Sequence, residues 1–117
     1  MLDSPTKFDF FRAAEAAIAH DDYNQAMQLY MQALRLSLAL SHNRPSLDVA
    51  ETHHRIANLF RSVGQYSDAD PHYSAAFSMY FGLVGELDER YKQVQRDWSI
   101  QLSLVALYAR RRAASTN

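Results

Sequence analysis

Residues 64–76 read GQYSDADPHYSAA, and residues 21–33 read DDYNQAMQLYMQA. Both stretches place Tyr, Ala, Tyr and Ala at the same spacings, so that Tyr66 follows Tyr23 by 43 residues. A fixed period between about 20 and 50 residues is typical of proteins built from stacked helical repeats. These two stretches therefore predict an internally repeated fold.

The rest of the chain is expected to be almost wholly helical. Gly and Pro number three each, and no segment sustains the alternation of apolar and polar residues that strands require. Turn residues divide the chain into five predicted helices: from Asp3 or Ser4 through Ile18, about 23–40, Ser46 through Phe60, from near Ser67 to about 82, and a last helix of about 25 residues. Pro5 is expected in the first turn of the first helix, and Pro71 near the first turn of the fourth.

Each unit carries an Ala, aromatic, Ala series that resembles the tetratricopeptide repeat family: Ala26, Tyr30, Ala33, then Ala69, Tyr73, Ala76. Residues 48–77, DVAETHHRIANLFRSVGQYSDADPHYSAAF, are similar to repeats of the kinesin light chain type. This resemblance implies one all-α domain, residues 1–117, forming a tetratricopeptide-like solenoid of helical hairpins. It would hold about two and a half repeats and a long C-terminal helix: repeat one at about 5–42, repeat two at about 46–85, and a half repeat or capping helix at about 87–112.

The chain also departs from the family pattern. Asp21 stands where the family prefers glycine, and His54 and Arg55 replace the two asparagines that the kinesin light chain type usually carries on its groove face. A peptide preference therefore does not transfer from that subfamily. In the half repeat, LSLVALY (residues 102–108) is similar to the start of repeat two, with Leu104, Val105 and Tyr108 matching Ile56, Ala57 and Phe60.

The resemblance further implies a concave groove, lined by the first helix of each repeat, that holds an extended segment of a partner. The expected groove residues are Phe11 and Glu15 from repeat one and Glu51, His54, Asn58 and Arg61 from repeat two. Steps of three and four place the second set on one helical face. The alternative is a solvated helix face without a ligand. The clamp for chaperone tails known in the family is not expected, because Phe11 and Glu15 replace its lysine and asparagine.

The last predicted helix carries an apolar seam at heptad-like spacing: Leu87, Tyr91, Val94, Trp98, Leu102 and Val105. A second apolar stripe, Ile100, Leu104 and Leu107, lies on another face, and one neighbouring helix does not bury both. We therefore expect a homo-oligomer, with a dimer favoured, in which Tyr91, Val94, Trp98, Leu102 and Val105 meet a second copy around Trp98. The alternative is that Trp98 folds back onto the fourth helix.

Composition argues against several classes of function. The net charge is −1 with acids and bases intermixed, and the only basic run, Arg110–Arg112, suits a helix C-terminus, so we expect no nucleic-acid partner. The chain has no cysteine, and its histidines lack metal-ligand spacing, so we expect no metal and no cofactor. It shows no secretion signal and no apolar run long enough to span a membrane, which favours a cytoplasmic protein.

No phosphate-binding loop or nucleophile motif occurs in the sequence, so we expect no enzymatic activity. The leading interpretation is a non-catalytic protein-interaction module or adaptor that holds a partner peptide or helix on its concave groove. The alternative is a structural homo-oligomerisation unit that uses the apolar faces of its last two helices.

Overall fold

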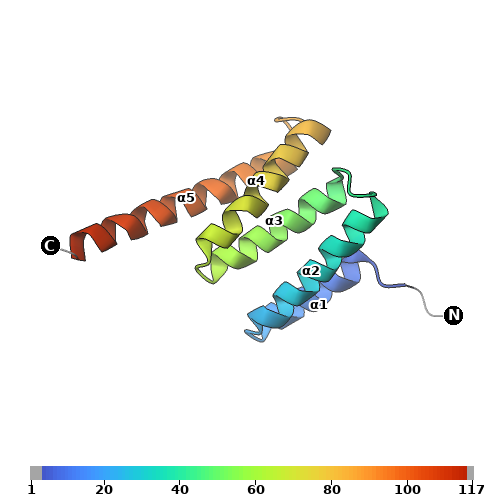
Figure 1. Ribbon diagram of the computed structural model, residues 1–117, viewed down its shortest axis with the longest axis horizontal. Coiled ribbons are helices and arrows are strands. Elements are labelled where there is room, and N and C mark those ends of the chain that lie inside the picture. The colour runs from blue at the N-terminus through green and yellow to red at the C-terminus, as the bar shows by residue number, and fades with distance from the viewer. Residues whose placement is uncertain (1–3, 116–117) are drawn as a thin grey trace.

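The computed structural model describes residues 4–115 and contains helices as its only regular secondary structure there. The helices are α1 (Lys7–Ala19), α2 (Tyr23–Leu40), α3 (Leu47–Ser62), α4 (Tyr66–Leu83) and α5 (Glu89–Ser115). The all-α class, the number of helices and the long C-terminal helix are therefore confirmed. Figure 1 shows α5 running well beyond the other four helices.

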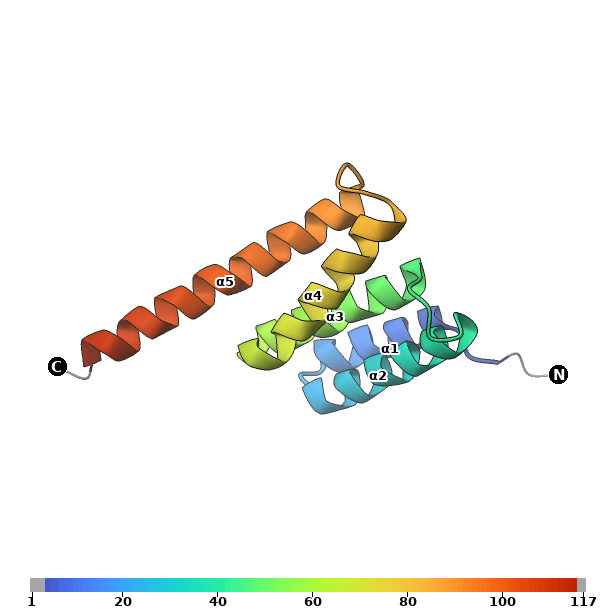
Figure 2. The ribbon, with the colours of Figure 1, turned by 45° about the horizontal axis from the view of Figure 1, so that its top comes forward.

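Each helix packs against its neighbours in the sequence. The main contacts join α1 to α2, α2 to α3, α3 to α4 and α4 to α5, with a smaller contact between α3 and α5. Successive helices run antiparallel, as Figures 1 and 2 show, and the molecule measures 65 × 35 × 21 Å. This sequential packing brings α5 against α4 and next to α3, which places it over the predicted groove.

The starts of the helices follow from local hydrogen bonding. The Ser46 hydroxyl accepts from the Val49 amide at 3.1 Å, which confirms Ser46 as the cap of α3. At α1 the cap is Thr6, whose amide donates to the Asp9 carboxylate at 2.8 Å. Pro5 therefore precedes the helix, and its predicted place in the first turn is wrong.

Pro71 lies inside α4, in its second turn and past the first-turn position that the sequence predicted. Proline has no N–H, so one helical hydrogen bond is absent there. Helix α4 nevertheless continues to Leu83, with Ala69 and Tyr73 fully buried on either side of the proline. Tertiary packing of this face therefore keeps α4 helical despite the missing backbone hydrogen bond at Pro71.

The 43-residue period is present in the backbone as well as in the sequence. Helices α2 and α4 begin and end at positions one period apart, and so do the C-terminal ends of α1 and α3. In the two hairpin turns, Asp21 (φ 59°) and Gly64 (φ 80°) both adopt the left-handed conformation. Glycine reaches that conformation without the steric cost that aspartate bears.

The core consists of two clusters that meet at α3. The first, formed with α1 and α2, contains Phe11, Ala14, Ala26, Tyr30, Ala33, Leu34, Val49, Ile56 and Leu59. The second, formed with α4 and α5, contains Ala50, Ala57, Ala69, Tyr73, Ala76, Tyr80, Tyr91 and Val94. Small alanines allow close approach of the helix axes, and the tyrosines fill the spaces between hairpins. Two neighbouring faces of α3 thus belong to different clusters.

Candidate functional site

A buried carboxylate on α5 organises the candidate site. Asp97 is 8% exposed, and its Oδ2 lies 2.6 Å from His54 Nε2. The same oxygen accepts from the Asn58 amide at 3.2 Å, and its Oδ1 accepts from Gln93 at 3.0 Å. The Arg61 guanidinium donates to the backbone carbonyl of Asp97 at 2.9 Å. The polar face of α3 is therefore hydrogen-bonded to α5.

Asn58 also connects this network to α4. Its side-chain carbonyl accepts from the Tyr73 hydroxyl at 2.5 Å, while its amide nitrogen donates to Asp97. Burial raises the pKa of Tyr73 to about 12, so the hydroxyl remains a hydrogen-bond donor at neutral pH. Three helices therefore meet at a single amide whose donor and acceptor are both used.

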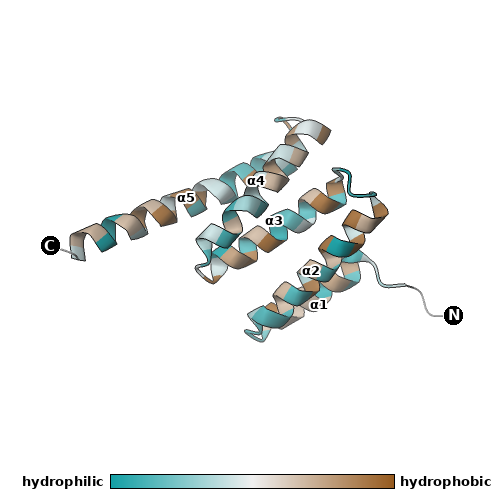
Figure 3. Cartoon of the chain, viewed as in Figure 1, coloured by the Kyte–Doolittle hydropathy of each residue, from teal (hydrophilic) through white to brown (hydrophobic). Residues whose placement is uncertain are grey.

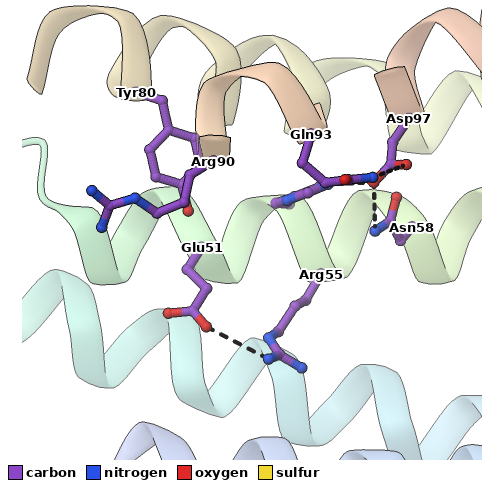
Figure 4. Close-up of a pocket in the computed structure, with 8 residues that line it drawn as sticks. Glu51, Arg55, Asn58, Tyr80, Arg90, Gln93 and Asp97 are labelled. Atoms are coloured by element: carbon purple, nitrogen blue, oxygen red, sulfur yellow. Dashed lines mark hydrogen bonds and ion pairs between the residues drawn. The ribbon is translucent and has the colours of Figure 1, made fainter. Parts of the chain in front are cut away.

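A pocket of about 490 Å³ opens beside this network, between α3 and α5. It is lined by Glu51, His54, Arg55, Asn58, Tyr80, Arg90, Gln93 and Asp97. Figure 4 shows Glu51 and Arg55 on one side and Gln93, Asp97 and Arg90 on the other. The pocket therefore offers two guanidinium groups, two carboxylates and two amides within one concave surface.

The charged groups at the rim already have partners within the chain. Arg55 donates to Glu15 on α1 at 2.9 Å, and lies 3.5 Å from Glu51. The Arg90 side chain makes two hydrogen bonds to the Asp88 carboxylate and its backbone amide makes a third, and these lower the pKa of Asp88 to about 2. Both Arg90 and Asp88 are at the surface, where such pairs exchange readily with other partners.

The predicted groove residues divide into three groups. Glu51, His54 and Asn58 line the pocket, as a shared groove requires. Glu15 lies at the rim through its pair with Arg55, whereas Arg61 is used to hold α5. Phe11 is only 3% exposed in the first core cluster, so it is not on the groove surface.

The predicted self-association residues are also divided. Tyr91 and Val94 are buried against α4 within the same chain. Trp98 stacks on Tyr73 with ring centroids 6.5 Å apart, and its indole N–H donates to Asp70 at 2.7 Å. Within the chain Trp98 therefore packs against α4, as the intramolecular alternative expected.

The remaining two residues of that set, Leu102 (55%) and Val105 (41%), are exposed. Leu104 (37%) and Tyr108 (61%) are exposed as well, whereas Ile56 and Ala57, the repeat-two residues matched to Leu104 and Val105, are fully buried. The part of α5 that packs on the hairpins is thus its first half, up to Gln101.

Several pocket residues had not been predicted. Arg90, Gln93 and Asp97 were missed because the groove was assigned from repeat units one and two alone. Arg55 and Tyr80 belong to repeat two, but Arg55 was not included in the predicted set, and Tyr80 lies on the second helix of its hairpin, outside the first helices from which the groove was assigned. Asp97 did carry a signal, since it lies three residues after Val94 on the apolar face of the last helix. A lone acid on an inward face requires polar partners on the neighbouring helix.

Two histidines form a separate contact between α3 and α4. The Nδ1 atoms of His53 and His72 are 2.9 Å apart, so one donates and the other accepts, and the His72 ring stacks on Phe60. Burial lowers the pKa of His53 to about 4 and also lowers that of His72. In the described part of the chain, no group of three or more His, Cys, Asp or Glu side chains is arranged to hold a metal ion.

This pair predicts a loss of stability in mild acid. The unfolded chain takes up protons near pH 6.5, while the folded pair resists them, so the folded state binds fewer protons. Stability is therefore expected to be full above about pH 6.5 and to decrease as the pH falls toward about 4. Thermal melts across this range test the prediction. A His53→Gln variant should show a smaller decrease, and a decrease identical to that of the original chain would contradict it.

Comparison of the chain with models of protein families, with curated proteins and with solved structures finds no match. Among residues 4–115, no helix combines the length and apolar character needed to cross a membrane.

Proposed function

We propose that this chain is a non-catalytic protein-interaction module with a tetratricopeptide-like solenoid architecture. In this proposal it holds an extended segment of a partner protein in the pocket between α3 and α5. The observation that carries the proposal is the pocket of about 490 Å³, in which side chains from two first helices of successive hairpins converge.

The repeated backbone supports the architecture. Each of the first two hairpins closes with the same turn, in which the amides of Asp22 and Gln65 donate to the carbonyls of Ala17 and Phe60 at 2.8 and 2.9 Å. Helix α5 then packs on α4 as α3 packs on α2. In a solenoid each unit contacts only its neighbours, and the order of contacts in this chain fits that rule.

The chemistry of the pocket favours an extended peptide. Every residue of an extended segment offers a backbone N–H and C=O. The exposed amide of Gln93 can match them with its second N–H and second lone pair, because Asp97 and Arg96 use only one of each. The amide of Asn58 is instead engaged with Tyr73 and Asp97. Arg90 and Arg55 can receive an acidic side chain, because a guanidinium binds a carboxylate with two parallel hydrogen bonds. Glu51 accepts from Lys7 at 2.9 Å within the chain, and it can receive a basic side chain of the ligand in exchange for that partner. We therefore propose a segment of mixed charge as the ligand.

The test is selection from a library of displayed random peptides by the original chain and two variants. Arg90→Glu reverses the charge of a pocket residue, and Arg44→Glu makes the same change at an exposed position outside the pocket, between α2 and α3. We expect peptides selected by the original chain to lose about tenfold or more in affinity for Arg90→Glu and to bind Arg44→Glu normally. Equal melting temperatures of the two variants serve as the control for folding.

If no peptide is selected by the original chain, or if both variants bind selected peptides equally well, the pocket is not a peptide site. The solvated face without a ligand is then the correct interpretation of these residues.

A further inference from the structure

The second half of α5 projects past the helix against which it packs. Residues 102–115 are all exposed, and at about 1.5 Å per residue they extend about 21 Å beyond Gln101. Figures 1 and 2 show this half projecting away from the other helices. Its base, at Leu102, Val105 and Tyr108, lines a cleft with α4.

This projecting half is unusually apolar. Residues 98–109 include no charged side chain, and hydrophobic positions recur along the projecting half in Figure 3. The exposed apolar side chains are Ile100, Leu102, Leu104, Val105, Leu107 and Tyr108. They lie on more than one face of the helix, and a helix that is apolar on several faces is normally buried.

A cleft of about 680 Å³ lies at the base of the projection, between α4 and α5. Its walls are formed by Tyr66, Ser67, Asp70, Pro71, Ser74, Gln101, Leu102, Val105 and Tyr108. Gln101 is 1% exposed, and its Oε1 atom is buried without a hydrogen-bond partner among the described residues. The cleft is thus apolar, with one carboxylate at its wall and one unsatisfied acceptor.

The first two hairpins contain a counterpart of this cleft. The pocket between α2 and α3 is lined by Tyr23 and Val63 among others and measures about 350 Å³. There the chain turns at Gly64, and Gln65 forms part of the pocket wall. At the corresponding point α5 makes no turn and continues as a helix. The larger cleft therefore has no turn residue in its wall, and its apolar side chains continue along the projecting half of α5.

We propose that the occupant is a second copy of this chain, and that two copies associate through a two-fold axis near Val105. The projecting half of α5 from each copy would lie antiparallel to the other and enter its α4/α5 cleft. The projecting half of α5 then supplies both the inserted helix and one wall of the cleft that receives its counterpart, and α4 supplies the other wall. A two-fold axis covers both with a single self-complementary patch.

Charge supports this occupant and fixes the direction. Asp70 is the only charged residue in the cleft wall, and the apolar stretch ends in Arg110, Arg111 and Arg112. In an antiparallel pair centred on Val105, Arg112 of one copy lies level with Trp98 of the other, whose indole binds Asp70. A parallel pair would instead place six arginines together. Complementary charge thus favours the antiparallel arrangement.

Sedimentation equilibrium of the full chain tests the proposal. We expect a dimer, and we expect Val105→Glu to weaken it by about 100-fold or more, because a carboxylate would be buried without a partner. The matched control is Leu87→Glu, which introduces the same charge at an 83% exposed apolar position outside the cleft. Val105 is exposed in the single chain, so unchanged helicity by circular dichroism is expected for both variants.

A second pair of variants tests the direction. Asp70→Asn retains an acceptor for the Trp98 indole but removes the negative charge of the cleft. The triple change of Arg110, Arg111 and Arg112 to glutamine removes the positive charge that would face it from the second copy. Each is expected to weaken the dimer by about tenfold, and their combination to weaken it by little more than either alone. A monomer at high concentration, a Val105→Glu variant that still dimerises, or fully additive charge effects would overturn the proposal.

Discussion

Replacing Asp97 with alanine is expected to lower the free energy of unfolding by about 3–5 kcal/mol. The carboxylate is nearly buried, and its removal leaves His54, Asn58 and Gln93 without their shared acceptor. Unpaired buried polar groups lose their hydration without compensation, which is why the expected loss is large. Urea unfolding followed by circular dichroism measures it.

The fluorescence of Trp98 gives an independent measurement of the same change. Trp98 is the only tryptophan, and it follows Asp97 directly on α5. If Asp97 holds α5 in place, Asp97→Ala should shift the emission toward longer wavelength below the unfolding transition, because the ring becomes hydrated. Asp97→Asn keeps the shape and one acceptor and should lose about 1–2 kcal/mol. Equal stability of the alanine variant and the original chain would show that the network does not anchor α5.

Replacing Tyr73 with alanine is expected to cost about 3–5 kcal/mol as well, but through packing. Tyr73 is the largest fully buried side chain, and its ring lies against Trp98. The truncation would leave a cavity where α3, α4 and α5 meet, and would remove the donor to Asn58. Thermal and urea unfolding provide the measurement.

Tyr73→Phe separates the two contributions. It keeps the ring and removes only the hydroxyl, so about 1–2 kcal/mol of loss is expected from the unsatisfied carbonyl of Asn58. Tyr30 is the repeat-one counterpart of Tyr73 and is also buried, in the first cluster. Tyr30→Ala should therefore destabilise the chain without changing Trp98 fluorescence before unfolding. A similar loss for Tyr73→Phe and Tyr73→Ala would contradict the packing explanation.

The sequence was sufficient for the helices because their signals are local. Caps such as Ser46 and turn residues such as Gly64 act within a few residues of the positions they determine. The repeat supported these predictions further, because the same pattern of helix and turn residues occurs twice in the chain. The exceptions were Pro5 and Pro71, which were both expected near the first turn of a helix. Pro5 precedes α1 because Thr6 caps that helix, and Pro71 lies in the second turn of α4, where packing maintains the helix.

The candidate site was predicted less completely because it depends on contacts between distant residues. The groove face with Glu51, His54 and Asn58 was expected from the resemblance to tetratricopeptide repeats, with helical spacing placing the residues on one face, and the structure places them at one pocket. Spacing does not reveal which neighbour faces them, so Arg61 was expected to be free although it donates to Asp97. The register of α5 against α4 determines that contact, and it is set by burial of Tyr91 and Val94.

The division of the core at α3 has a consequence for local opening of the native state. Val49, Ile56 and Leu59 belong to one cluster, while Ala50 and Ala57, on the other face, belong to the second. Either hairpin partner can separate from α3 while the other remains packed, so hydrogen exchange is expected to occur in two cooperative units. Amides of α3, shared by both units, should exchange slowest, and those of residues 102–115 fastest in the separated chain. Helix α3 would then stay folded while either the α1/α2 pair or the α4/α5 pair separates from it.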